Sequence, residues 1–122
     1  MTNSPCSTPI FFTGYIGPGE VVSHEFFADC PNEELRVTFQ WPQHGWYGEP
    51  VVYMGAALVD ENGAGINSAS KEVWQDIIQG PGTWFPGLWT AYLRNTGHNV
   101  EPYIISVYIG EWAKIPTPGR PG

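Results

Sequence analysis

The 122-residue sequence contains few basic residues, few cysteines and no long hydrophobic run. Only 5 Lys and Arg stand against 12 Asp and Glu, for a net charge of −7. This excludes a surface for nucleic acid or anionic membranes, because such binding depends on clustered positive charge. No apolar stretch could span a bilayer, so we expect no membrane span. The start of the chain also lacks the basic and apolar regions of a signal peptide, which leaves a mature fragment and a cytosolic protein both open.

The two cysteines, Cys6 and Cys30, allow at most one disulfide bridge. Cys6 precedes the first predicted strand and Cys30 follows the second, so a hairpin of these strands would bring both to one end. We therefore predict a bridge that contributes roughly 3 kcal/mol for a loop of this size, with two separate buried thiols as the alternative. Two cysteines do not by themselves fix the redox compartment. No paired CxxC motif or histidine-rich spacing indicates zinc.

Aromatic residues, glycine and proline are abundant. Aromatics make up 15% of the chain, which holds 15 Gly and 12 Pro but only 14% charged residues. This composition favours many short strands joined by turns over helices. We predict an all-β, antiparallel β-sandwich of about seven to eight strands across residues 10–112. An N-terminal arm at 1–9 and a Pro/Gly-rich tail or linker at 113–122 would flank this single domain.

The longest apolar run, residues 51–59, is predicted to be the central strand, because neither of its alternating faces is polar. The strand at 35–41 is predicted to be half-buried, with Arg36 and Thr38 facing away from the core. The segment 70–78 also fits one face of a helix, and we favour a strand. Alternation of apolar and polar residues predicts strands at 10–16, 20–28, 35–41, 51–59, 71–79, 88–94 and 103–109.

Three segments follow one another in a characteristic order: residues 60–63 (DENG) at the end of the apolar strand, residues 86–95 (PGLWTAYLRN) and residues 102–109 (PYIISVYI). This order resembles the bacterial pre-peptidase C-terminal domain, over roughly residues 14–110. The resemblance implies a jelly-roll-like β-sandwich of a kind often appended to secreted enzymes, which sometimes binds polymers such as collagen or polysaccharide. On this basis we expect a secreted or cell-surface protein, with a cytoplasmic one as the alternative.

Catalytic motifs are scarce in the sequence. No Gly-x-Ser-x-Gly nucleophile elbow occurs, and His24, His44 and His98 are scattered over a strand and two loops, so no nucleophilic triad is indicated. Carboxylates could be paired as in a glycosidase, but no spacing selects a pair. We therefore predict that the domain is not an enzyme.

One turn offers oxygen-bearing side chains of the kind that calcium prefers, at Asp60, Glu61 and Asn62. The EF-hand pattern is absent, and an Asp-x-Asn-Gly sequence is common in plain hairpins. We predict a structural turn and no cofactor, with Asp60 and Asn62 as the candidate ligands if calcium binds.

Two aromatic loops, residues 42–50 and 80–87, are the strongest functional feature of the sequence. If the seven strands alternate in direction, these loops share one end of the sandwich with 17–19, whereas Asp60 and the turn at 95–99 lie at the other end. The shared end then gathers six candidate ligand-binding residues, which are His44, Trp46, Tyr47, Glu49, Trp84 and Phe85. The alternative is that these aromatics fold inward as a cap on the core, the role we expect of the strand tryptophans Trp41, Trp74 and Trp89.

Aromatic planes beside carboxylate and amide groups suit the C–H faces and hydroxyls of sugars, and they equally suit a protein hot spot. We therefore predict a lectin-like, non-catalytic module that binds carbohydrate. The alternative from another class is a protein-protein interaction module or structural subunit that packs its aromatic end on a partner or in a homo-oligomer.

Overall fold

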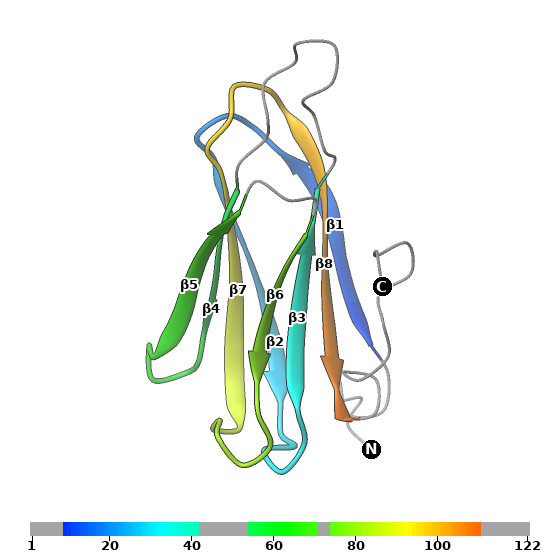
Figure 1. Cartoon of the computed structure of the whole chain (residues 1–122), viewed down its shortest axis with the longest axis vertical. Coiled ribbons are helices and arrows are strands. Elements are labelled where there is room, and N and C mark those ends of the chain that lie inside the picture. The colour runs from blue at the N-terminus through cyan, green and yellow to red at the C-terminus, as the bar shows by residue number, and fades with distance from the viewer. Residues whose placement is uncertain (1–8, 42–53, 71–73, 111–122) are drawn as a thin grey trace.

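The computed structural model describes residues 9–41, 54–70 and 74–110, and within these residues the chain forms eight strands and no helix. Figure 1 shows them as two layers of long, twisted strands. The strands are β1 (Ile10–Ile16), β2 (Val21–Ala28), β3 (Leu35–Gln40), β4 (Met54–Val59), β5 (Gly65–Ser70), β6 (Trp74–Gln79), β7 (Gly87–Asn95) and β8 (Glu101–Ile109).

The strands form two antiparallel sheets of four strands each. The first sheet has the order β1-β8-β3-β6, and the second sheet has the order β2-β7-β4-β5. Each connection along the chain from β1 to β4 crosses from one sheet to the other, and the order in the two sheets is that of an eight-stranded jelly roll. The predicted all-β, jelly-roll-like sandwich is confirmed.

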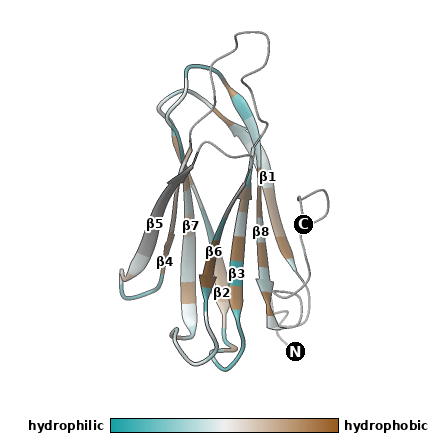
Figure 2. Cartoon of the chain, in the orientation of Figure 1, coloured by the Kyte–Doolittle hydropathy of each residue, from teal (hydrophilic) through white to brown (hydrophobic). Residues whose placement is uncertain are grey.

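The core lies between the two sheets because each strand turns one alternating set of apolar side chains inward. In β7 the inward set includes Trp89, Ala91 and Leu93, all buried, while the residues between them are more exposed. Figure 2 shows the corresponding alternation of hydrophobic and hydrophilic bands along β3. Trp41 and Trp89 belong to this core, as predicted, and the side chain of Trp74 lies outside the described part.

The structure refines the prediction for the run 51–59 and corrects the prediction for the strand at 35–41. The run 51–59 corresponds to β4, an inner strand of the second sheet, and the structure describes it from Met54. Strand β3 is buried on both faces, so the prediction that Arg36 and Thr38 face solvent was wrong: both are buried. The guanidinium carbon of Arg36 lies 4.7 Å from the ring centroid of Tyr108 on the neighbouring strand β8, and this stacking shields Arg36 on the outer face of the first sheet.

The segment around 70–78 is a strand in its described part, β6, as we favoured. Pairing of β5 with β4 across the turn at 60–64 adds a strand that the sequence analysis did not separate. One extra strand reverses the direction of every later connection. The loop at 80–86 therefore lies at the end of the sandwich that carries 29–34 and 60–64, whereas the turn at 96–100 joins 17–20 at the opposite end (Figure 1).

Main-chain hydrogen bonds fix both groupings. The amide of Gly82 donates to the carbonyl of Pro31 at 2.6 Å, and the amide of Gly19 donates to the carbonyl of Asn95 at 2.8 Å. The prediction that residues 17–19 and 80–87 lie at the same end of the sandwich was therefore wrong. Most of the predicted arm at 1–9 and all of the predicted tail at 113–122 lie outside the described residues.

Candidate functional site

The two described residues of the predicted aromatic site have different environments. Trp84 is 4% exposed, its indole N–H donates to the carbonyl of Glu33 at 2.8 Å, and its ring meets Trp89 edge-on at 5.9 Å. It closes the core at the end of the sandwich and is not an exposed platform, which is the alternative that the sequence left open. Phe85, the next residue, is 67% exposed and remains accessible to a ligand.

A cavity of about 240 Å³ lies beside these two residues, and Asp60 and Gln79 also line it. Both nearby indoles already donate their N–H groups within the protein, Trp84 to Glu33 and Trp89 to the carbonyl of Phe85 at 3.0 Å. Drug-sized ligands generally occupy sites of about 300–1,000 Å³. This cavity is smaller than that range, so we do not place the main binding site here.

The Asp60 carboxylate holds the β4–β5 turn together. Its Oδ1 accepts hydrogen bonds from the main-chain amides of Asn62 and Ala64, both at 2.9 Å, and Gly63 supplies the positive φ of +84° that the turn requires. These contacts are those of a structural turn. Among the residues that the structure describes, no group of three or more His, Cys, Asp or Glu side chains is placed to hold a metal ion.

The remaining predicted site residues, His44, Trp46, Tyr47 and Glu49, lie outside the described residues, as does Cys6. Cys30 follows β2 and packs half-buried against the core. The predicted Cys6–Cys30 bridge therefore stays a prediction.

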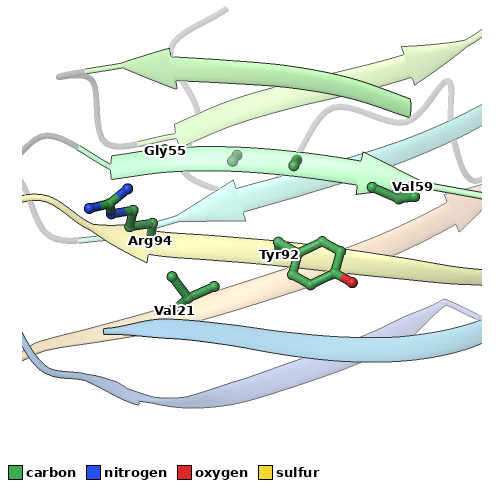
Figure 3. Close-up of a pocket in the computed structure, with 7 residues that line it drawn as sticks. Val21, Gly55, Val59, Tyr92 and Arg94 are labelled. Carbon is green, nitrogen blue, oxygen red and sulfur yellow. The ribbon is translucent and has the colours of Figure 1, made fainter. Parts of the chain in front are cut away.

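A larger groove lies on the outer face of the second sheet. It has a volume of about 420 Å³, and Figure 3 shows it between side chains of β2, β7 and β4. The groove is lined chiefly by Val21, Gly55, Ala57, Val59, Tyr92 and Arg94.

Strand register explains the shape of this groove. The outward positions of β4 carry Gly55 and Ala57, which are too small to fill the space above the sheet. On the neighbouring strand β7, Arg94 is the register partner of Gly55, and Tyr92 is the partner of Ala57. Large side chains on one strand therefore stand beside a strand that presents almost none, as Figure 3 shows. The result is a preformed trough whose wall is built on rigid sheet.

Tyr92 and Arg94 were not among the predicted site residues, although in the sequence they alternate along 88–94 with the apolar residues Trp89, Ala91 and Leu93. Tyr92 is 37% exposed, and Arg94 is exposed as well. The signal that could have found the site is the combination of an outward aromatic and cation on one strand with outward Gly and Ala on its neighbour. Recognising it required knowledge that β4 and β7 pair, which the sequence does not state.

A second polar feature joins the two sheets at their β1 and β2 edges. The Nε2 atom of His24 and the hydroxyl oxygen of Tyr103 are hydrogen-bonded at 2.7 Å, and the ring of Phe12 stacks on His24 with centroids 4.6 Å apart. Burial lowers the pKa of His24. Burial also raises the pKa of the Tyr103 hydroxyl, with the charge of Glu20 as a smaller cause. His24 is thus a structural residue at the edge of the core, and not a surface histidine.

The lowered pKa of His24 predicts a loss of stability in acid. The unfolded chain binds the proton more readily than the folded one, so the stabilising contribution is present above about pH 6.5 and declines as the pH falls below this value. We expect His24→Gln to flatten the dependence of Tm on pH between about pH 8 and pH 5. The exposed His98→Gln serves as the control, and equal slopes for the two variants would contradict the assignment.

No helix in the described ranges is both long and apolar enough to cross a membrane. The jelly-roll order agrees with the fold that the sequence resemblance implied, but the resemblance itself stays a prediction. A scan against protein-family models finds no match to this chain, and no curated protein matches it in sequence.

Proposed function

We propose that this domain is a non-catalytic carbohydrate-binding module that holds a glycan in the groove on the outer face of the second sheet. The observation that carries the proposal is the groove itself, a trough of about 420 Å³ with a floor of Gly55 and Ala57 and a wall of Tyr92 and Arg94. Its volume falls within the range of about 300–1,000 Å³ that ligand sites occupy.

The chemistry of the lining suits a sugar. The C–H face of a pyranose ring can pack on the exposed tyrosine ring of Tyr92, while the phenolic hydroxyl and the guanidinium of Arg94 form hydrogen bonds with sugar hydroxyls. Both residues lie on the nine-residue strand β7, between β2 and β4. Because this part of the site is preformed on strands, binding orders little main chain, which reduces the entropic cost of association.

The absence of catalytic groups from the lining supports a binding function over hydrolysis. Glycoside hydrolases generally place two carboxyl groups across the substrate, roughly 5–10 Å apart. The described residues that line the groove include no Asp, Glu, His, Ser or Cys. We therefore infer a domain that holds a glycan without cleaving it, consistent with a secreted or cell-surface location.

A second candidate function is self-association through apolar residues at the other end of the same sheet. Phe27 on β2 and Leu88 on β7 are register partners, 52% and 40% exposed, and Phe85 lies three residues before Leu88. Large apolar groups gathered on a surface favour an interface. A homodimer that Phe27→Ser disrupts, observed by size exclusion with light scattering, together with no glycan binding, would favour this candidate.

Replacing Tyr92 with alanine tests the proposed function. The change removes the stacking surface but no inward-facing core residue, so we expect glycan affinity to fall about 10–100-fold with little change in Tm. The probes are xylan, β-glucan, polygalacturonate and alginate, first in affinity electrophoresis and then in calorimetry with oligosaccharides of those that bind.

The matched control is Tyr15→Ala, which removes a tyrosine that is 74% exposed on β1 of the first sheet. We expect this variant to bind like the parent protein. Equal losses in both variants, or none in Tyr92→Ala while the parent protein binds, would place the glycan elsewhere.

A further inference from the structure

The guanidinium of Arg94 has an unusual setting at one end of the groove. Its register partners on either side are Gly55, which has no side chain, and Val21, which is apolar. Within the described part of the chain, no hydrogen bond or ion pair involves this guanidinium. The described residues thus leave the five donors of the group available to an anion on this face.

On the same outer face of the sheet, the charged side chains of Arg94 and Glu25 lie far apart along the strands. Glu25 is the outward acidic residue of β2, and its register partner Thr90 lies four residues from Arg94 on β7, a separation of about 13 Å along the strand. Among the outward side chains of β2 and β7, the positive charge thus lies at the Arg94 end of the groove and the negative charge of Glu25 at the other. Glu20, which precedes Val21, has its carboxylate at the main-chain amide of Gly17, from which it accepts a hydrogen bond at 2.7 Å. Arg36, another of the protein's five basic residues, is buried against Tyr108 on the other sheet and cannot serve this face.

We propose that the groove selects glycans that carry carboxylate groups, as uronic acid polymers do, and that Arg94 is the residue that determines this specificity. The inference rests on the proposed function and names its ligand class. Tyr92 and Arg94 are two residues apart on one strand, about 7 Å. One sugar ring can therefore stack on Tyr92 while a carboxylate on that ring or the next pairs with Arg94.

The guanidinium suits a carboxylate better than it suits a neutral hydroxyl. Its planar fork can donate two parallel hydrogen bonds to the two oxygens, and such charge-assisted pairs are roughly twice as strong as neutral ones. The protein's net charge of −7 repels an anionic glycan at long range. That repulsion is screened over about 10 Å at 0.1 M salt, whereas the contact pair is screened much less.

The test compares free and methyl-esterified forms of the same oligosaccharides, made from polygalacturonate, alginate and hyaluronate. Methyl esters keep the sugar ring and remove the charge. We expect the parent protein to bind at least one free-acid form about tenfold more tightly than its ester, a preference that Arg94→Gln abolishes and Arg94→Lys retains in part. The Tm of each variant, expected to be unchanged, verifies folding.

Other outcomes overturn the inference in distinguishable ways. Equal affinity for acid and ester, or binding of neutral xylan and β-glucan alone, would contradict carboxylate selection and leave the proposed function in place. Displacement of the uronate by dextran sulfate at equal concentration would mean recognition of any anion, and would also contradict it. No binding of any glycan, charged or neutral, would remove the proposed function and this inference together.

Discussion

Trp84→Ala is expected to lower the free energy of unfolding by about 3–5 kcal/mol, the usual loss for a buried tryptophan. Its side chain is 4% exposed, packs edge-on against Trp89 and donates to the carbonyl of Glu33. The substitution therefore opens a cavity between the loop at 80–86 and the core, and leaves one acceptor without its partner. Urea denaturation followed by circular dichroism measures the change.

Phe85→Ala is the matched control for this prediction. Phe85 is the adjacent residue in the same loop and is 67% exposed, and the variant keeps the main-chain carbonyl that accepts a hydrogen bond from Trp89. We expect a loss within about 0.5 kcal/mol, as for most surface substitutions. Similar, small losses in both variants would show that Trp84 is exposed in solution, as a ligand-binding residue of an aromatic loop would be.

Asn95→Ala is expected to cost about 2–4 kcal/mol, because one fully buried amide makes three hydrogen bonds that the variant loses. The side-chain amide nitrogen donates to the carbonyls of Ile16 and Asn99, at 3.0 and 2.7 Å, and the side-chain oxygen accepts from the amide of Gly97 at 2.8 Å. The bond to Ile16 ties the end of β7 in one sheet to the end of β1 in the other, and the bonds with Asn99 and Gly97 hold the turn that follows β7. Thermal and urea unfolding would both report the loss.

Two further variants separate the causes of this loss. Asn95→Asp keeps the acceptor but removes both donors and faces two carbonyls with a carboxylate, so we expect it to be no more stable than Asn95→Ala. Asn99→Ala removes an exposed side chain and keeps the main-chain carbonyl that Asn95 uses, so its stability should match that of the parent protein. A stable Asn95→Ala would mean that this corner is not needed to hold the sheets together.

Much of the fold could be predicted from the sequence because apolar and polar residues alternate in most strands. The inward set of β7, with Trp89, Ala91 and Leu93, is buried where the pattern put it. However, alternation of apolar and polar residues does not show whether side chains from neighbouring strands cover the outer face of a sheet. In β3 the pattern predicted that Arg36 and Thr38 would face solvent, whereas stacking on Tyr108 and packing within the first sheet bury them.

The candidate site could be predicted less well, because a site depends on which strands are neighbours. Leaving β5 out of the count reversed the direction of the later strands, and so moved Trp84 and Phe85 to the wrong end of the sandwich. The groove depends on the pairing of Gly55 with Arg94 and of Ala57 with Tyr92, residues about 35–39 positions apart in the chain. Local patterns describe each strand's faces, but such long-range register comes from the packing of the whole chain.

The most direct test of the central claim is an NMR titration of the ¹⁵N-labelled protein with a bound oligosaccharide from the panel above. We expect the chemical-shift changes to centre on the outward positions of β4 and β7, at Gly55, Ala57, Tyr92 and Arg94. Changes centred instead on Phe85 and the turn at 60–64, or on the outer face of the first sheet, would contradict this location of the binding site.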